Sequence, residues 1–220
     1  MGLDFFKLDN PSLLYLLGGI WVTLQYAGLS ICLGFIGGTF LAIAKISTFL
    51  PFRILAQVYV SLFRGTPLLV QLFLIYFGLP HLLPIQITPF EAGIAAFSLN
   101  SAAYVCEIIR SGIQSIDKGQ MEAALSLGIS RSVAMRQIIL PQAVKNILPA
   151  LVNEMVNLLK ESAIVSVIGE ADLLRRAQNI TAEKYIYFEP YLAVALIYYV
   201  LVMILTLFAK LLEDRLKRSD

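Results

Sequence analysis

The chain has 220 residues, of which 58% are hydrophobic and only 15% are charged, and its formal net charge is +2. A soluble domain carries about 25% charged residues, so the composition favours one membrane domain over residues 1–220 and offers no bulk charge for binding nucleic acid. Two cysteines and one histidine build neither a disulfide framework nor a metal centre, and we predict no catalytic residues.

The first predicted span covers residues 13–44. Residues 10–44 contain no Asp, Glu, Lys or Arg, and about 20 apolar residues are enough to cross a bilayer. The preceding MGLDFFKLDN lacks the basic start and cleavage site of a signal peptide, so we expect an uncleaved span. Gly34 and Gly38 have the spacing that lets two helices approach closely in lipid, although a glycine-rich span without a specific partner has the same pattern.

The second predicted span, residues 54–78, carries Arg64 in its middle. The Gly65-Thr66-Pro67 sequence that follows should break or kink the helix and free backbone polar groups. Broken helices line solute paths in transporters, whereas a plain proline kink packed by neighbouring helices would leave the same sequence. Gln71 lies one turn beyond the break, and both Arg64 and Gln71 are candidates for contact with the solute.

The third predicted span, residues 89–112, has a clear start and a polar face. Thr88, Pro89 and Glu91 have the spacing of a capping box with proline in the first helical position. Within the span, Glu107 and Arg110 are three residues apart and are expected to pair along the helix, with contact to the substrate as the alternative. Three polar side chains at about one-turn spacing are candidates for lining a solute cavity: Asn100, Ser101 and Tyr104.

Residues 113–145 form the longest segment between spans, and they predict a rigid helical hairpin. Asp117 and Gln120 have the spacing of a capping box for a first helix, which Gly128 then ends in a left-handed conformation. Ser130 is placed to cap a second helix, which Pro141 is expected to break. A projecting hairpin with one apolar side suits docking into a groove on a partner.

The fourth predicted span, residues 147–169, begins near Asn146 or Pro149 and contains an acidic residue. Glu161 lies past the midplane of the bilayer, where a charge marks a functional site by default. We prefer Glu161 as the partner of a charged group on the substrate, with a pair to Arg64 or to a lysine of a second protomer as the alternative. The fifth predicted span covers residues 190–210.

The Lys and Arg residues between the spans predict the orientation. Ten of them fall in residues 45–53, 113–145 and 210–220, and four fall in residues 1–12, 79–88 and 170–189. Cytoplasmic loops carry the excess of Lys and Arg, so the N-terminus is expected outside and the C-terminus inside. The fold class predicted is therefore an all-α integral membrane protein with five transmembrane helices and a cytoplasmic coupling helix.

Four stretches of the sequence carry a family resemblance. Glu-Ala-Ala at residues 122–124, Gly128 and Ile-Leu-Pro at residues 139–141 resemble the EAA loop of bacterial ABC importer permeases, with the family's spacing between the glycine and the proline. FRGTPLLVQ at residues 63–71, the pattern from Ala103 to Ile113, and LKES at residues 159–162 with SVIG at residues 166–169 resemble the polar amino acid branch of that family. Glu161 departs from the pattern, which more often has aspartate there.

The resemblance implies a multi-pass permease subunit in a bacterial inner membrane. It implies a dimer of ATPase subunits, a second permease subunit that is a copy or a close homologue, and an extracytoplasmic amino acid-binding protein. The chain itself has no GxxxxGK[ST] phosphate loop, so ATP and Mg are expected on the ATPase and no cofactor on this chain. The residues implied in ATPase coupling are Glu122, Ala123, Ala124, Gly128 and Ile129.

The substrate implied is a polar amino acid. If Glu161 faces the cavity, a basic one such as arginine, histidine or lysine is favoured. A stand-alone channel or secondary carrier is the alternative function, and the structured hairpin argues against it because such a protein needs no partner for coupling. An intramembrane enzyme is disfavoured because the sequence has no HExxH motif and no second histidine.

Overall fold

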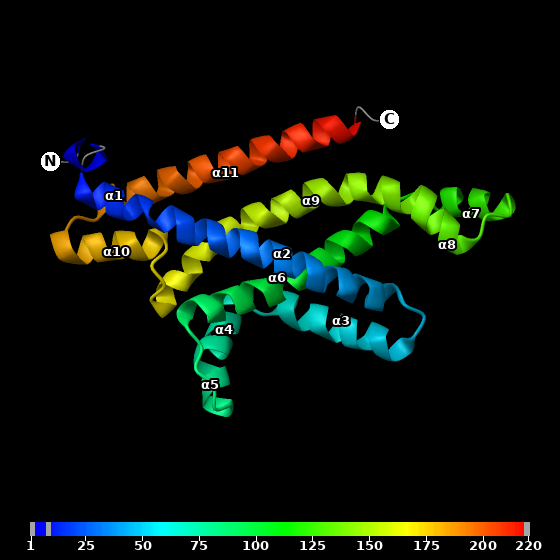
Figure 1. Cartoon of the computed structure of the whole chain (residues 1–220), viewed down its shortest axis with the longest axis horizontal. Coiled ribbons are helices and arrows are strands. Elements are labelled where there is room, and N and C mark those ends of the chain that lie inside the picture. Colours follow the sequence, from blue (N-terminus) through cyan, green and yellow to red (C-terminus); the bar gives the residue numbers. More distant parts are fainter. Residues whose placement is uncertain (1–2, 8–9, 218–220) are drawn as a thin grey trace.

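The computed structural model describes residues 3–7 and 10–217, and every regular element within them is a helix, which confirms the all-α class (Figure 1). The elements at the N-terminal end, up to the first sharp bend, are η1 (Leu3–Phe6), α1 (Pro11–Leu17), α2 (Gly19–Ile46) and α3 (Leu50–Gly65). The next are α4 (Leu68–Phe73), η2 (Leu74–Gly78), α5 (Leu79–Leu82), α6 (Pro89–Gln114), α7 (Lys118–Ser126) and α8 (Arg131–Ala134). The last are η3 (Met135–Ile139), α9 (Leu140–Glu161), η4 (Ser162–Ile168), α10 (Leu173–Lys184) and α11 (Phe188–Lys217).

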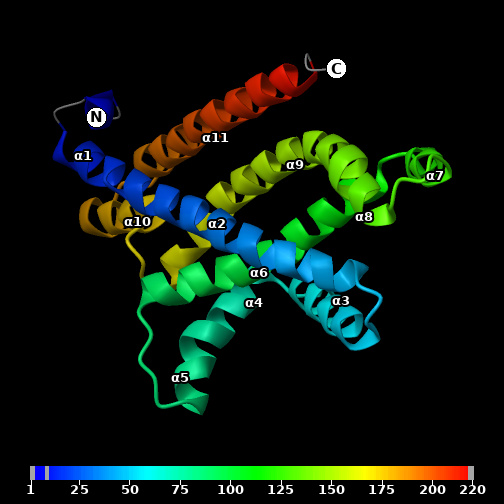
Figure 2. The same ribbon diagram turned by 45° about the vertical axis from the view of Figure 1, so that its right-hand side comes forward.

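The centre of the fold is the crossing of α2, α6 and α9 (Figures 1 and 2). A side chain added at Gly34 would lie 2.5 Å from the Oγ of Ser101, and one at Gly38 would lie 2.7 Å from the Cβ of Val105. Only glycine permits this approach of α2 to α6, so the predicted close packing at Gly34 and Gly38 is confirmed, with a helix of the same chain as its partner.

The second predicted span is broken. α3 ends at Gly65, α4 begins at Leu68, and the two parts meet at an angle of 104°. The prediction of a break at Gly65-Thr66-Pro67 is therefore confirmed, and the bent pair of helices together covers the residues of the second predicted span. Beyond the break the chain turns sideways, and α4 and α5 extend away from the α2–α6 crossing (Figures 1 and 2).

Pro141 does not end its helix, which corrects one expectation. The chain stays helical from Arg131 through Pro141 and Pro149 to Glu161, so the helix of the fourth predicted span begins well before residue 147. The wider π turn η3 directly precedes this stretch. A π turn is wider than an α turn, which gives the ring of a following proline room, and the side-chain amide of Gln142 donates to the carbonyl of Ile138 at 2.8 Å. The same device, π turn η2, precedes Pro80 in α5.

Three helical stretches are long and apolar enough to cross a membrane, or four if the bent pair counts as one span. The three are residues 11–46 (α1 with α2), 89–114 (α6) and 188–215 (α11). The fourth predicted span does not pass this test, because its helix α9 carries Lys145, Glu154, Lys160 and Glu161. It nevertheless packs against α2, α6 and α11, inside the bundle.

The two ends of the molecule differ. α1 and α10 lie at the end that holds the N-terminal residues, and α7 with α8 lies at the opposite end, beyond the ends of α6 and α9 (Figure 1). At the first end, the guanidinium of Arg176 donates to the carbonyl of Tyr15 at 2.7 Å and joins α10 to α1. Arg218, which counts among the predicted cytoplasmic cations, lies outside the described residues.

Candidate functional site

The break between α3 and α4 forms an elbow that buried side chains hold closed. Because the chain leaves helical geometry at Thr66 and Pro67, the carbonyls near the end of α3 have no helical partner. The side-chain amide of Gln71 donates to the carbonyl of Phe63 at 2.8 Å, to the carbonyl of Thr66 at 3.1 Å and to its hydroxyl at 2.9 Å. One glutamine thus satisfies the backbone groups that the break releases.

Asn100 of α6 completes the elbow. Its amide donates to the side-chain oxygen of Gln71 at 3.0 Å and to the carbonyl of Phe63 at 3.3 Å. Both amide side chains are buried. The structure thus brings together two residues that the sequence nominated for the solute, and it uses them to join α3, α4 and α6. Their contact with a solute stays a prediction.

A charged cluster of four residues, Lys45, Arg64, Glu107 and Arg110, lies next to the elbow. Arg110 donates to Oε2 of Glu107 at 2.7 and 3.1 Å, which confirms the pair predicted along α6. The ammonium of Lys45 donates to Oε1, and Arg64 approaches Oε2 to 3.7 Å. Sequence reasoning missed Lys45 here because it counted that residue among the cytoplasmic cations. Lys45 lies in the last turn of α2, and a long lysine side chain at a helix end can reach a neighbouring helix. That position could have suggested a partner inside the bundle.

The three polar residues predicted to share a face of α6 have separate environments. The guanidinium of Arg64 lies over the ring of Tyr104, 5.2 Å from its centre, which is cation–π geometry. Ser101 is instead fully buried near Gly34 of α2. Asn100 belongs to the elbow, so only Tyr104 remains half-exposed toward open space.

Two acids lie on α9. Glu161 closes the helix, is exposed, and takes part in no ion pair within the described residues, and Arg64 lies near Glu107 instead. Glu154 is buried two turns earlier, among α2, α6 and α9, and sequence reasoning missed it. The spacing of seven residues puts both carboxyls on one face of α9, and that spacing was the signal that could have found the pair.

The helical hairpin over residues 113–145 forms as predicted in most respects. Asp117 caps α7, although its carboxylate accepts from the N–H of Gly119 at 2.6 Å instead of bonding Gln120. Gly128 has φ +78°, and two backbone bonds, from Gly128 to Leu125 and from Ile129 to Ala124, make a Schellman motif. The predicted left-handed end of α7 is confirmed, and it fixes the direction of the chain into α8.

The EAA residues on α7 divide into exposed and buried. Glu122 and Ala123 are exposed, whereas Ala124 is buried where α7 packs on α8 and η3. Leu127, at the tip of the hairpin, is 80% exposed. The hairpin therefore has a packed inner side and an outer side that carries an acidic residue, an alanine and an apolar tip.

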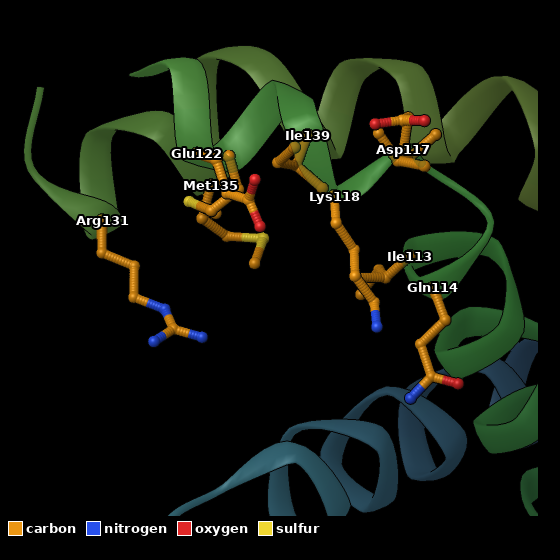
Figure 3. Close-up of a pocket in the computed structure, with 10 residues that line it drawn as sticks. Ile113, Gln114, Asp117, Lys118, Glu122, Arg131, Met135 and Ile139 are labelled. Carbon is orange, nitrogen blue, oxygen red and sulfur yellow. The ribbon is translucent and has the colours of Figure 1, made fainter. Parts of the chain in front are cut away.

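A groove of about 620 Å³ lies between the end of α6, α7 and η3. Figure 3 shows Lys118, Gln114 and Arg131 with their polar ends turned into the open side, while Met135 and Ile139 lie on its wall and Asp117 points away. Met121 and Glu122 complete the lining on the α7 side. The groove combines an adaptable apolar wall with charged edges, which suits a protein segment better than a small apolar ligand.

A further buried carboxyl lies at the start of α10. Asp172 caps that helix, since its Oδ1 accepts from the N–H of Arg175 at 2.8 Å. Its Oδ2 is buried and has no hydrogen-bond partner in the described part of the chain. Burial raises the pKa of Asp172 to about 6, because the charged form loses its hydration there.

Comparisons with known proteins agree on one family. Residues 31–218 match the model described as binding-protein-dependent transport system inner membrane component. The arginine transport system permease protein ArtQ of Bacillus subtilis is 52% identical over 220 residues, which is 100% of both chains. The putative glutamine transport system permease protein GlnP of Rickettsia typhi is 50% identical over 206 residues, or 94% of both chains.

Solved structures agree as well. A chain from the crystal structure of an amino acid ABC transporter with histidines has a TM-score of 0.92 and 47% identity, covering 98% of each chain. A chain of the MetNI methionine ABC transporter in an inward-facing conformation has a TM-score of 0.70 at 21% identity and covers 96% of this chain and 99% of its own, which shows the shared fold alone. This chain therefore belongs to the binding-protein-dependent transport system inner membrane components, and within them to the permease subunits of amino acid ABC importers.

Proposed function

We propose that this permease couples the import of a polar amino acid to a separate ATPase through α7, in a bacterial inner membrane. The observation that carries the proposal is the hairpin of α7 and α8. It is locked by a left-handed glycine, packed on its inner side, and exposed on its outer side at Glu122 and Ala123. A rigid projection of this kind passes a movement of its partner to α6 and α9, with which it is continuous in the chain.

The wider assembly belongs to the same proposal. Two ATPase subunits that hold ATP and Mg engage the hairpins of two permease subunits, and a binding protein delivers the solute from outside. The hairpin and the N-terminal end lie at opposite ends of the molecule, which supports an N-terminus outside and a hairpin in the cytoplasm (Figure 1). Five crossings follow if the bent pair of helices and α9 each count as one.

The coupling role is tested at Gly128 with two matched substitutions. Asparagine tolerates the left-handed conformation, whereas valine does not. We expect Gly128→Asn to keep ATPase co-purification and uptake, and Gly128→Val to insert in the membrane but to uncouple ATP hydrolysis from uptake. Normal co-purification and normal uptake by the valine variant would rule out coupling through this end of α7.

The preference for a basic substrate is proposed from the acids on α9. Glu161 is exposed and takes part in no ion pair within the described residues, so it offers negative charge to a cationic side chain, and Glu154 lies buried on the same face of the helix. The relative named for arginine transport is in line with this, while the one named for glutamine is not. Glu161→Gln should lower arginine uptake more than glutamine uptake, and equal effects on both would remove the argument.

A further inference from the structure

The charged cluster next to the elbow has more positive than negative charge. Glu107 is its only acid, against the three cations Lys45, Arg64 and Arg110. The cluster joins α2, α3 and α6, of which α2 and α6 cross at the centre of the fold. An unbalanced charge inside a membrane protein is costly unless a counterion or water reaches it, so the two excess positive charges call for an anionic partner.

The three cations are not equivalent. Lys45 bonds one oxygen of Glu107, and Arg110 bonds the other with two of its nitrogens. Both carboxylate oxygens thus have donors without Arg64. Arg64 lies 3.7 Å from Oε2, beyond hydrogen-bond distance, and its guanidinium makes no hydrogen bond within the described residues. Its side chain is 43% exposed.

The guanidinium of Arg64 is nevertheless held in place. It lies over the ring of Tyr104, and its backbone belongs to the last turn of α3, which the bonds of Gln71 and Asn100 fix at the elbow. A guanidinium stacked on a ring keeps the N–H groups at its edge available. Two of these N–H groups can bond the two oxygens of one carboxylate. Arg64 is therefore a positioned donor with no acceptor of its own.

We propose that Arg64 binds the α-carboxylate of the amino acid in transit. This inference rests on the proposed function, and it names the group of the substrate that this side of the permease recognises. All amino acids share the α-carboxylate, so one site of this kind serves a substrate with a cationic side chain and one with a neutral side chain alike. The side-chain preference then lies elsewhere, on the acidic face of α9.

The experiment compares each amino acid with its decarboxylated amine. Equilibrium binding is measured to the purified complex of this chain with its ATPase, without a binding protein. The probes are arginine with agmatine, lysine with cadaverine, histidine with histamine, and glutamine with 4-aminobutanamide. Arg64→Gln should weaken binding of the preferred amino acid by roughly ten- to a hundredfold and leave the matching amine within about twofold of wild type.

Two further variants keep the result interpretable. Arg64→Lys retains the charge and should lose less affinity than Arg64→Gln. Arg53→Gln removes an exposed arginine from the same helix and should change the affinity for neither the amino acid nor the amine. Equal losses for amino acid and amine, or no loss for either, would overturn the inference. So would loss of the assembled permease dimer without a change in amino acid selectivity, because Arg64 would then pair with a carboxylate of the second permease. If the wild-type complex binds none of the four amino acids, the proposed function itself fails.

Discussion

The elbow between α3 and α4 and the hairpin of α7 and α8 are both turns between helices, but they are stabilised by opposite means. The elbow depends on side chains from distant parts of the chain, since Asn100 is 37 residues from the carbonyl of Phe63 that it bonds. The hairpin depends on residues within a few positions of each other, such as Asp117 with Gly119 and Ile129 with Ala124.

The difference follows from the surroundings of each turn. Lipid tails offer no donor to a broken helix, so each released carbonyl needs a donor from the protein or from water in a cavity. Outside the membrane, water can bond the backbone groups that the local caps do not satisfy. The outer side of the hairpin therefore needs no contact within the chain and can bind a partner. Substitutions that remove a buried side-chain donor should therefore do most damage at the elbow, and those that change size should do most at the packed side of the hairpin.

The largest expected effect is that of Gln71→Leu. The substitution leaves the carbonyls of Phe63 and Thr66 without their main donor, and each unsatisfied group inside a membrane protein costs several kcal/mol. We expect a loss of about 3 kcal/mol or more in the free energy of unfolding. Thermal unfolding in detergent checks this, with Gln57→Leu as the control because Gln57 is an exposed glutamine on the neighbouring helix α3. Equal stability of the two variants would contradict a role for Gln71 in closing the elbow.

An intermediate effect is expected at the neighbouring alanines of α7. Ala124→Leu inserts three carbon atoms into the buried contact with α8 and η3, at a cost of about 1–3 kcal/mol. Ala123→Leu places the same atoms in solvent and should leave the fold intact while it weakens association with the ATPase. Limited proteolysis of the hairpin in membranes reports the first effect, and co-purification of the ATPase reports the second. The comparison breaks down if Ala123→Leu loosens the hairpin as much as Ala124→Leu does.

The smallest expected effect is at a third site, the start of α10, where a local cap and a buried polar atom without a partner occur in one residue. Asp172 is capped locally through Oδ1, as in the hairpin, but its buried Oδ2 has no partner in the described residues. The raised pKa, about 6, means that the folded state holds a proton which the unfolded state releases near pH 4. This stabilisation is therefore fully present below pH 4 and is lost as the pH rises through 6.

Lowering the pH from 7 to 5 should accordingly raise the free energy of unfolding by about 1 kcal/mol from Asp172 alone. Asp172→Asn keeps the cap and has no charge to titrate, so most of this pH dependence should disappear. The neighbouring Glu170 has a pKa that burial also raises, and it contributes a residual slope of the same sign. Arg176, whose guanidinium donates to the carbonyl of Ala171, is the nearby cation. Thermal unfolding at several pH values measures both slopes, and an unchanged slope in the variant would exclude Asp172 as the source.

Sequence alone determined the features that depend on nearby residues. Apolar runs fixed the helical membrane class, Thr88 and Glu91 formed their capping box, and Gly128 took the left-handed conformation. The break at Gly65-Thr66-Pro67 was predicted because it depends on three consecutive residues. The pair of Glu107 with Arg110 was predicted because the two residues are one helical turn apart. The family followed from motifs of this kind, which are local strings of residues.

Only the tertiary structure decided which distant groups meet. It showed that Lys45 and Arg64 reach Glu107, that Gln71 and Asn100 close the elbow, and that Glu154 lies buried on the face of Glu161. It also showed that a π turn carries the helix past Pro141, where the sequence indicated an end. The physical reason is the same in each case: a polar group inside the membrane must find a partner, and the partner is set by the crossing of helices and not by its distance along the chain.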